Sequence, residues 1–321
     1  MKLLHYGCFL FLMAMVLPET SGQTPASATS AHSALIHCVA ISANGQRLAT
    51  ASFDNTAKVW DINPDGSLKE KIILKGHTAG VCAVAFNPQD ENVVATGGQD
   101  KTVRLWDISS GQVKLEMKGH TDTVEAVAFS PDGTRLASCG ADKTVRLWNV
   151  GEGKELKNLG SHDGTVYSLA FSPDGQYLAS AGSGKDNLIK IWDMKQLKEV
   201  KQLKGHEQPV TAVVFIDNDR IVSTSMDRSL RIWNVKEGQE SKKLGPTNDD
   251  PYFVVWSPTS KRIAVCGYSG SITTWAMDAD KPKFTAQLKN PAYSIAFGPE
   301  GKTVYTGHNN GALIRTVLDE K

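Results

Sequence analysis

Short apolar runs alternate with turn residues along the chain, and the same order of elements returns several times. In one unit a Gly-His pair at 119–120 precedes an apolar run that ends at Phe129, and the turn 130–133 reads Ser-Pro-Asp-Gly. Proline presets φ for a turn and glycine accepts the left-handed region, so this turn predicts a connection between two strands. A run of small residues at 136–139 and a third run at 144–148 follow. With a variable fourth run, the unit predicts four short antiparallel strands.

The tryptophans show the repeat period. Five tryptophans recur at regular intervals, and Trp275 is the sixth member of this series. At the same spacing, the seventh position is occupied by Thr316. Seven units of about 43 residues account for residues 23–321, and four strands in each unit are typical of a β-propeller blade. The sequence therefore predicts an all-β fold, a seven-bladed propeller of four-stranded antiparallel blades. The earlier members, each followed by Asp or Asn and spaced 41 to 46 residues apart, are Trp60, Trp106, Trp148, Trp192 and Trp233.

Residues 1–22 have the organisation of a secretory signal peptide. Lys2 precedes the ten-residue apolar run 8–17, and Pro18 and small polar residues follow. Ten residues span about 15 Å as a helix, half of a hydrocarbon core, so a cleaved signal is favoured over a retained anchor. We expect residues 23–321 to form an exported protein, periplasmic or secreted. The alternative is a retained apolar segment that presents the same domain at a membrane.

The four cysteines after the signal segment lie in apolar, strand-like runs. An even number of cysteines in an exported protein is compatible with disulfides. A free cysteine in such a run behaves as a small hydrophobic residue, and this interpretation is favoured here. The four residues are Cys38, Cys82, Cys139 and Cys266.

The charge balance argues against a partner bound mainly through its phosphates. Lys and Arg number 35, Asp and Glu number 34, and the formal net charge is +1. Nucleic-acid binding is driven by clustered positive charge, so no nucleic-acid partner is expected. The chain also contains no C-x-x-C, no H-E-x-x-H and no glycine-rich phosphate loop. An enzyme is therefore the minority interpretation, and no cofactor is expected.

The Gly-His pair that opens a repeat unit and the Trp followed by Asp or Asn near its end resemble the motifs of the WD-repeat β-propeller family. The resemblance covers residues 24–321. It is most specific in the first five units, whereas units six and seven depart from the pattern.

The resemblance implies a hydrogen-bonded set of His, Ser or Thr, Asp and Trp in each intact blade. An indole N–H needs an acceptor, a hydroxyl donates and accepts, and an imidazole can link the hydroxyl to a carboxylate. Because the set returns five times in register, we interpret it as structural and not as a catalytic triad. Blade four has two extra residues in its turn. The sets are His32, Thr50, Asp54, Trp60; His77, Thr96, Asp100, Trp106; His120, Ser138, Asp142, Trp148; His162, Ser180, Asp186, Trp192; and His206, Ser223, Asp227, Trp233.

The resemblance also implies which side chains point to one face of the ring. Tyr252 and Tyr268 on blade six, Tyr293 on blade seven and Phe53 on blade one would be neighbours in a closed ring. Aromatic anchors with a polar group are typical of interfaces, so we expect an aromatic crescent on one rim. The alternative is that these rings fill volume where blades six and seven lack the structural set. The candidate partner-binding residues are Phe53, Glu125, Tyr167, Lys185, Met226, Tyr252, Tyr268 and Tyr293.

The last unit is too short to complete itself. Only five residues follow Thr316, too few for a turn and a fourth strand. Residues 24–31 stand at the fourth-strand position before His32, so we expect them to pair with 313–317 and close the ring. This pairing removes a sheet edge, and the family resemblance implies the same closure.

The sequence thus predicts a non-catalytic interaction scaffold that binds a protein or peptide on one face of the propeller. The alternative from another class is a propeller enzyme, or a small-ligand-binding protein, that uses the central channel. No metal site is expected. His37 and His308 lie on adjoining blades and could form a metal pair, but two surface histidines are the favoured interpretation.

Overall fold

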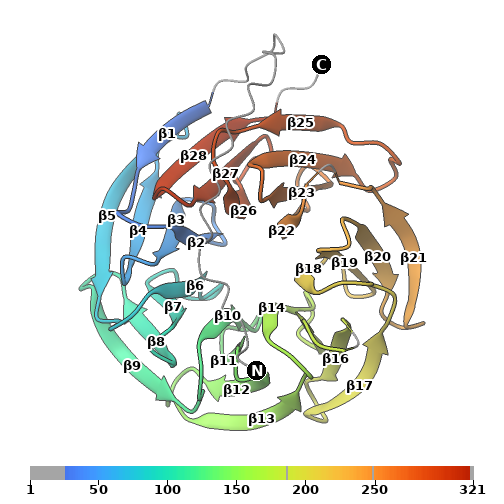
Figure 1. The fold of residues 1–321 in the computed structure, drawn as a ribbon. Coiled ribbons are helices and arrows are strands. Elements are labelled where there is room, and N and C mark those ends of the chain that lie inside the picture. Colours follow the sequence, from blue (N-terminus) through green and yellow to red (C-terminus); the bar gives the residue numbers. More distant parts are fainter. Residues whose placement is uncertain (1–25, 186, 248, 319–321) are drawn as a thin grey trace, which may run out of the picture.

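The computed structural model describes residues 26–185, 187–247 and 249–318. Within these ranges the chain forms 28 strands in seven four-stranded antiparallel sheets, and it forms no helix. Figure 1 shows the sheets arranged as blades around a ring. The predicted all-β, seven-bladed propeller is confirmed. The described part of the chain accordingly contains no helical membrane span, and the predicted signal peptide, 1–22, lies outside it.

Each blade has an innermost strand near the axis of the ring and a second strand beside it. The innermost strands of blades one to seven are β2 (Ile36–Ile41), β6 (Val81–Phe86), β10 (Val124–Phe129), β14 (Val166–Phe171), β18 (Val210–Phe215), β22 (Pro251–Ser257) and β26 (Ala292–Phe297). The second strands, in the same order, are β3 (Arg47–Ser52), β7 (Val93–Gly98), β11 (Arg135–Gly140), β15 (Tyr177–Gly182), β19 (Arg220–Ser225), β23 (Arg262–Gly267) and β27 (Thr303–His308).

The third and outer strands complete the blades. The third strands are β4 (Thr56–Ile62), β8 (Thr102–Asp107), β12 (Thr144–Asn149), β16 (Ile189–Asp193), β20 (Leu230–Asn234), β24 (Ser271–Ala276) and β28 (Ala312–Val317). The outer strands are β5 (Leu68–Lys75), β9 (Gln112–Lys118), β13 (Glu155–Ser161), β17 (Lys198–Leu203), β21 (Gln239–Leu244), β25 (Phe284–Gln287) and, in blade seven, β1 (Ala26–Ser30).

Burial decreases from the second strand to the outer strand. All six residues of β7 are buried, whereas Met117 is the one buried residue of β9. The core lies between neighbouring blades: Trp106 of blade two is fully buried against Ala49, Ala51 and Val59 of blade one. Small side chains in the second strand leave room for the indole of the next blade, which explains why the repeat alternates alanine-rich strands with tryptophan.

The first described strand closes the ring. β1 pairs antiparallel with β28, in register from Ala26 opposite Thr316 to Ser30 opposite Ala312. The backbone N–H groups of Ala31 and His32 both donate to the carbonyl of Gly311 at 3.0 Å. In Figure 1 the blue β1 lies beside the red β28, so the first and the last described strands belong to one blade. The predicted closure is confirmed.

The structural sets are hydrogen-bonded within their blades. In blade three the indole N–H of Trp148 donates to Ser138 Oγ at 2.8 Å, and Ser138 Oγ lies 2.7 Å from His120 Nε2. His120 Nδ1 lies 2.8 Å from Asp142 Oδ2. The same contacts in blades one, two and five measure 2.7 to 3.1 Å. In blade four His162 and Trp192 contact Ser180, and Asp186 lies outside the described residues.

Blade six replaces the set with different polar contacts. Val265 pairs with Thr273, two residues before Trp275, at the position that Ser138 occupies in blade three. Valine offers no acceptor, and the Trp275 indole N–H has no hydrogen-bond partner among the described residues. Asp249 accepts hydrogen bonds from the hydroxyls of Ser269 and Ser271 at 2.7 and 2.8 Å.

A candidate partner-binding face

Each of the seven described innermost strands has a bulge at its second residue. In β2 the pairing with β3 passes from Ile36 directly to Cys38, and the other six innermost strands skip the corresponding residue. A bulge leaves one residue out of the ladder and redirects its side chain. These seven residues, called the bulge ring below, are His37, Cys82, Glu125, Tyr167, Thr211, Tyr252 and Tyr293.

The turn after the second strand lies on the same face as the bulge ring. The backbone N–H groups of Phe53, Met226 and Tyr268 donate to the carbonyls of Leu35, Pro209 and Asp250, which directly precede three innermost strands. This face, called the bulge face below, therefore carries the bulge ring and the three turn residues. It includes seven of the eight predicted partner-binding residues.

Lys185 lies farther along its turn than its counterparts. In blade four the corresponding hydrogen bond is made by the N–H of Ser183, which donates to Thr165 at 2.8 Å. The two extra residues in this turn place the exposed Lys185 two positions beyond Ser183. Its equivalence to Phe53 and Tyr268 is therefore wrong by two residues.

Three tyrosines from blades six and seven form one group on the bulge face. The rings of Tyr252 and Tyr293 are stacked, with centroids 4.9 Å apart and an interplanar angle of 19°. The ring centroids of Tyr268 and Tyr252 lie 6.1 Å apart, and Tyr268 is 51% exposed. Burial, reinforced by the neighbouring tyrosines, raises the pKa of the Tyr252 phenol well above its usual value. This tyrosine cluster offers aromatic rings for packing and hydroxyls that can donate or accept hydrogen bonds.

Phe53 belongs to a separate aromatic pair. Its ring stacks on His37, with centroids 5.4 Å apart and an angle of 12°, and it is 37% exposed. The predicted aromatic crescent thus consists of the tyrosine cluster and a Phe53–His37 pair on blade one.

The remaining predicted residues lie between these two groups around the ring. Glu125 and Tyr167 are half-buried members of the bulge ring on blades three and four. Met226, in blade five, is 40% exposed. Burial raises the pKa of the Glu125 carboxyl, and His37 opposes that rise.

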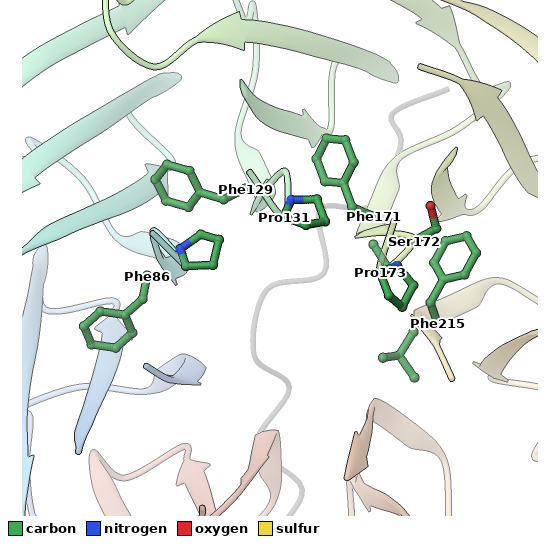
Figure 2. Close-up of a pocket in the computed structure, with 10 residues that line it drawn as sticks. Phe86, Phe129, Pro131, Phe171, Ser172, Pro173 and Phe215 are labelled. Atoms are coloured by element: carbon green, nitrogen blue, oxygen red, sulfur yellow. The ribbon is translucent and has the colours of Figure 1, made fainter. Parts of the chain in front are cut away.

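A pocket of about 330 Å³ opens at the other end of the innermost strands. It is lined by Phe129, Phe171 and Phe215, which end β10, β14 and β18, together with Pro131 and Pro173 from the turns that follow (Figure 2). The tyrosines lie near the beginning of such strands, so this pocket belongs to the opposite face. None of its lining residues is titratable, so it offers apolar packing and no acid–base group. Sequence reasoning missed this pocket, although the repeated Phe and Pro were visible.

His308 is not a surface histidine. It is fully buried, its Nε2 lies 2.8 Å from Thr306 Oγ1, and its Nδ1 lies 3.0 Å from the carbonyl of Pro291. Burial lowers the pKa of this imidazole. Both ring nitrogens are engaged, so His308 is not available for the metal pair with His37.

The cysteines of the described chain are free, as the sequence interpretation favoured. Cys82, Cys139 and Cys266 are buried and Cys38 is half-buried. Burial raises the pKa of all four thiols.

The fold and this face define a β-propeller with its variable side chains gathered at one end of the innermost strands. The chain belongs to the WD-repeat family: a family described as "WD domain, G-beta repeat" matches residues 23–61, 68–107, 111–149, 153–193 and 197–234. The five matched units are those whose motifs carried the resemblance.

Curated relatives match parts of the chain. THO complex subunit 3 from Arabidopsis thaliana is 45% identical over 82 residues, 25% of this chain and 26% of that protein. The human protein Coronin-7 is 34% identical over 97 residues, 29% of this chain and 10% of that protein. A WD repeat-containing protein 26 homolog from Arabidopsis thaliana is 41% identical over 68 residues, 21% and 11% of the two chains. The matched region thus spans about a quarter or less of each relative, and none of these names describes an enzyme.

Proposed function

We propose that this protein is a non-catalytic scaffold that binds a protein or peptide partner through the bulge face. The tyrosine cluster carries the proposal. Tyrosine is enriched among residues that dominate interface energies, and rings already packed together lose little freedom on binding. The exposed ring of Tyr268 lies beside the stacked pair, where a partner side chain can pack and also meet hydroxyl groups.

The names of the relatives support a role in assemblies. One of them is named as a subunit of a complex. That role belongs to the relative, and it reaches this chain only as part of the proposal. WD-repeat propellers act mostly as interaction domains, which agrees with a protein partner.

The charged side chains support a partner that is not a nucleic acid. The cations two residues before the repeat tryptophans are paired within their blades: Arg104 with Glu116 at 3.0 Å, Arg146 with Glu155 at 2.5 Å and Arg231 with Glu240 at 2.6 Å. Cations that are already paired attract phosphates weakly.

Loss of the tyrosine cluster is expected to weaken partner capture. Purified full-length protein is used to capture partners from its native extract, with identification by mass spectrometry. The Tyr252→Ala, Tyr293→Ala double variant is expected to weaken capture of the specific partner by about tenfold or more, since interface tyrosines often contribute over 1 kcal/mol each. Tyr268→Ala, an exposed position, is a milder second variant.

Tyr177→Ala is the matched control, because Tyr177 begins β15 and lies at the opposite end of the innermost strands. Melting curves verify that each variant is folded. A partner captured equally well by the parent protein and both bulge-face variants would contradict this placement of the site.

We further propose that the protein is exported, on the basis of the charged start and apolar run of residues 1–22. Mass spectrometry of the protein isolated from cell fractions gives both its location and its first residue. Protein that stays in the cytoplasm with Met1 or Lys2 at its start would contradict export.

A further inference from the structure

Three side chains with different metal-ligating atoms meet on the bulge face. His37, Cys82 and Glu125 occupy the same bulged position in blades one, two and three. One nitrogen, one sulfur and one carboxylate oxygen from them all lie within 4.8 Å of one another. The three residues come from consecutive blades. The other four members of the bulge ring, Tyr167, Thr211, Tyr252 and Tyr293, carry hydroxyl groups.

The imidazole of His37 is held in one orientation. Its Nδ1 lies 2.7 Å from the carbonyl oxygen of Cys82, an acceptor, so Nδ1 carries the proton and donates it. The other nitrogen, Nε2, then has a free lone pair. Phe53 stacks on the ring at 5.4 Å and restricts its rotation. Histidine ligands in metal sites are typically fixed by such a hydrogen bond from the second nitrogen to a carbonyl.

The other two side chains have no competing strong partner. Cys82 is 2% exposed, and its Sγ makes one weak contact, 4.0 Å from the carbonyl of Gly80. The carboxylate of half-buried Glu125 makes no hydrogen bond to another described residue. A carboxylate in this position is costly to bury unless a cation or a donor compensates it.

We propose that His37, Cys82 and Glu125 bind one zinc ion on the bulge face through an imidazole nitrogen, the Cys82 Sγ and the Glu125 carboxylate. Nitrogen, sulfur and oxygen together suit zinc, whereas a thiolate disfavours magnesium and calcium. Tetrahedral zinc holds its ligand atoms about 3.5 Å apart, so atoms that all lie within 4.8 Å of one another need to approach by at most about 1.3 Å. Three protein ligands leave the fourth coordination position to water.

The proposal is independent of the tyrosine cluster. The three ligands come from blades one to three, whereas the tyrosines come from blades six and seven. The Tyr252→Ala, Tyr293→Ala variant is therefore expected to bind zinc as the parent protein does.

Zinc titration of the full-length protein tests the site. The protein is reduced, treated with a chelator and titrated with zinc chloride by calorimetry. We expect one ion per chain with a Kd of about 1 µM or tighter. Cobalt(II) in place of zinc is expected to give a thiolate-to-metal charge-transfer band. His37→Gln, Cys82→Ser and Glu125→Gln are each expected to weaken zinc binding by at least about tenfold, and Cys82→Ser is expected to remove the band.

Tyr167→Phe is the matched control, because Tyr167 occupies the same bulged position in blade four and supplies none of these ligands. Melting curves of the metal-free variants verify folding, and the half-buried Glu125 provides the mildest substitution. Either no stoichiometric binding by the parent protein, or unchanged affinity in Cys82→Ser and Glu125→Gln, would overturn the proposal.

Discussion

Deletion of residues 26–30 is expected to lower the melting temperature by about 10 °C. The deletion removes β1, which pairs with β28 through five residue pairs and so joins the first and the last described strands. A net contribution of about 0.5–1 kcal/mol for each of the five residue pairs makes the loss on the order of 3 kcal/mol. For a domain of this size, each kcal/mol corresponds to about 2–4 °C. The uncovered edge of β28 is also expected to promote aggregation.

A side-chain substitution in β1 provides the control. Ser27, Ala28 and Ser30 are exposed, so the closure depends mainly on the backbone ladder. Ala28→Ser keeps that ladder and is expected to melt as the parent protein does. Thermal unfolding followed by circular dichroism compares the three proteins. A deletion variant that melts within about 1 °C of the parent would show that the closure contributes little.

Acidification from pH 7 to pH 4 is expected to destabilise the fold through its buried histidines. Burial, with a smaller contribution from the Lys190 ammonium, lowers the pKa of His162 from 6.5 to about 4. Burial also lowers the pKa of His32 and His77, although Asp54 and Asp100 oppose the shift. At a pH between the lowered pKa of a folded histidine and the unfolded value of 6.5, the unfolded chain binds more protons than the folded chain. Stability is therefore complete above about pH 6.5 and is lost as the pH falls toward 4.

The aspartates of the structural sets extend this loss to lower pH. Burial tends to raise the pKa of Asp142 and Asp227, but hydrogen bonds, those from His120 and His206 foremost, outweigh it and lower the pKa of both. A lowered carboxyl pKa stabilises the fold above the unfolded value of 3.8 and ceases to do so as the pH falls below it.

His162→Gln isolates one histidine from the rest. The shift at His162 is worth about 3 kcal/mol between pH 7 and pH 4. Urea unfolding at a series of pH values gives the free energy of unfolding of the parent and the variant. The variant is expected to show a pH dependence that is smaller by about this amount. An identical dependence in both proteins would mean that His162 is not held neutral by burial.

The fold was predictable because each blade repeats the same chemistry. The spacing of Trp60, Trp106 and their counterparts gave the number of blades, and the short last unit required a strand from the other end of the chain. The expected partners, 24–31 with 313–317, agree with the observed pairing of Ala26–Ser30 with residues 312–316.

Prediction failed where one blade differs from the repeat. Gly98 ends the second strand of blade two, where an added Cβ would lie 2.9 Å from His77 Nδ1. His308 holds the corresponding end of β27, so its ring enters the buried region that the Gly-His imidazole occupies elsewhere. Because His308 does not lie at the Gly-His position of the repeat, the sequence pattern did not show that its ring is buried. The two extra residues in the turn of blade four led to a similar difference at Lys185. The length of an insertion does not show which turn residue makes the backbone hydrogen bond, and here that residue is Ser183.

The candidate site was predictable in its positions and not in its contacts. The sequence placed Tyr252, Tyr268 and Tyr293 on neighbouring blades, and the structure shows their rings in contact. The approach of His37 to Cys82 and Glu125 was missed. Ligand motifs in sequences are short-range, whereas each of these residues comes from a different blade. All three occupy the second position of the innermost strand in successive repeats, and this equivalence could have predicted that they lie close together.

Site-specific photo-cross-linking tests the proposed function most directly. A photoreactive phenylalanine analogue replaces Tyr268 in the tyrosine cluster or, as a control, Leu156 on the outer strand β13, two side chains that are 51% and 45% exposed. We predict that one partner protein is cross-linked from position 268 and not from position 156, and that Tyr252→Ala with Tyr293→Ala strongly reduces the yield of this product. A partner cross-linked equally from both positions, or from position 156 alone, would contradict a binding site on the bulge face.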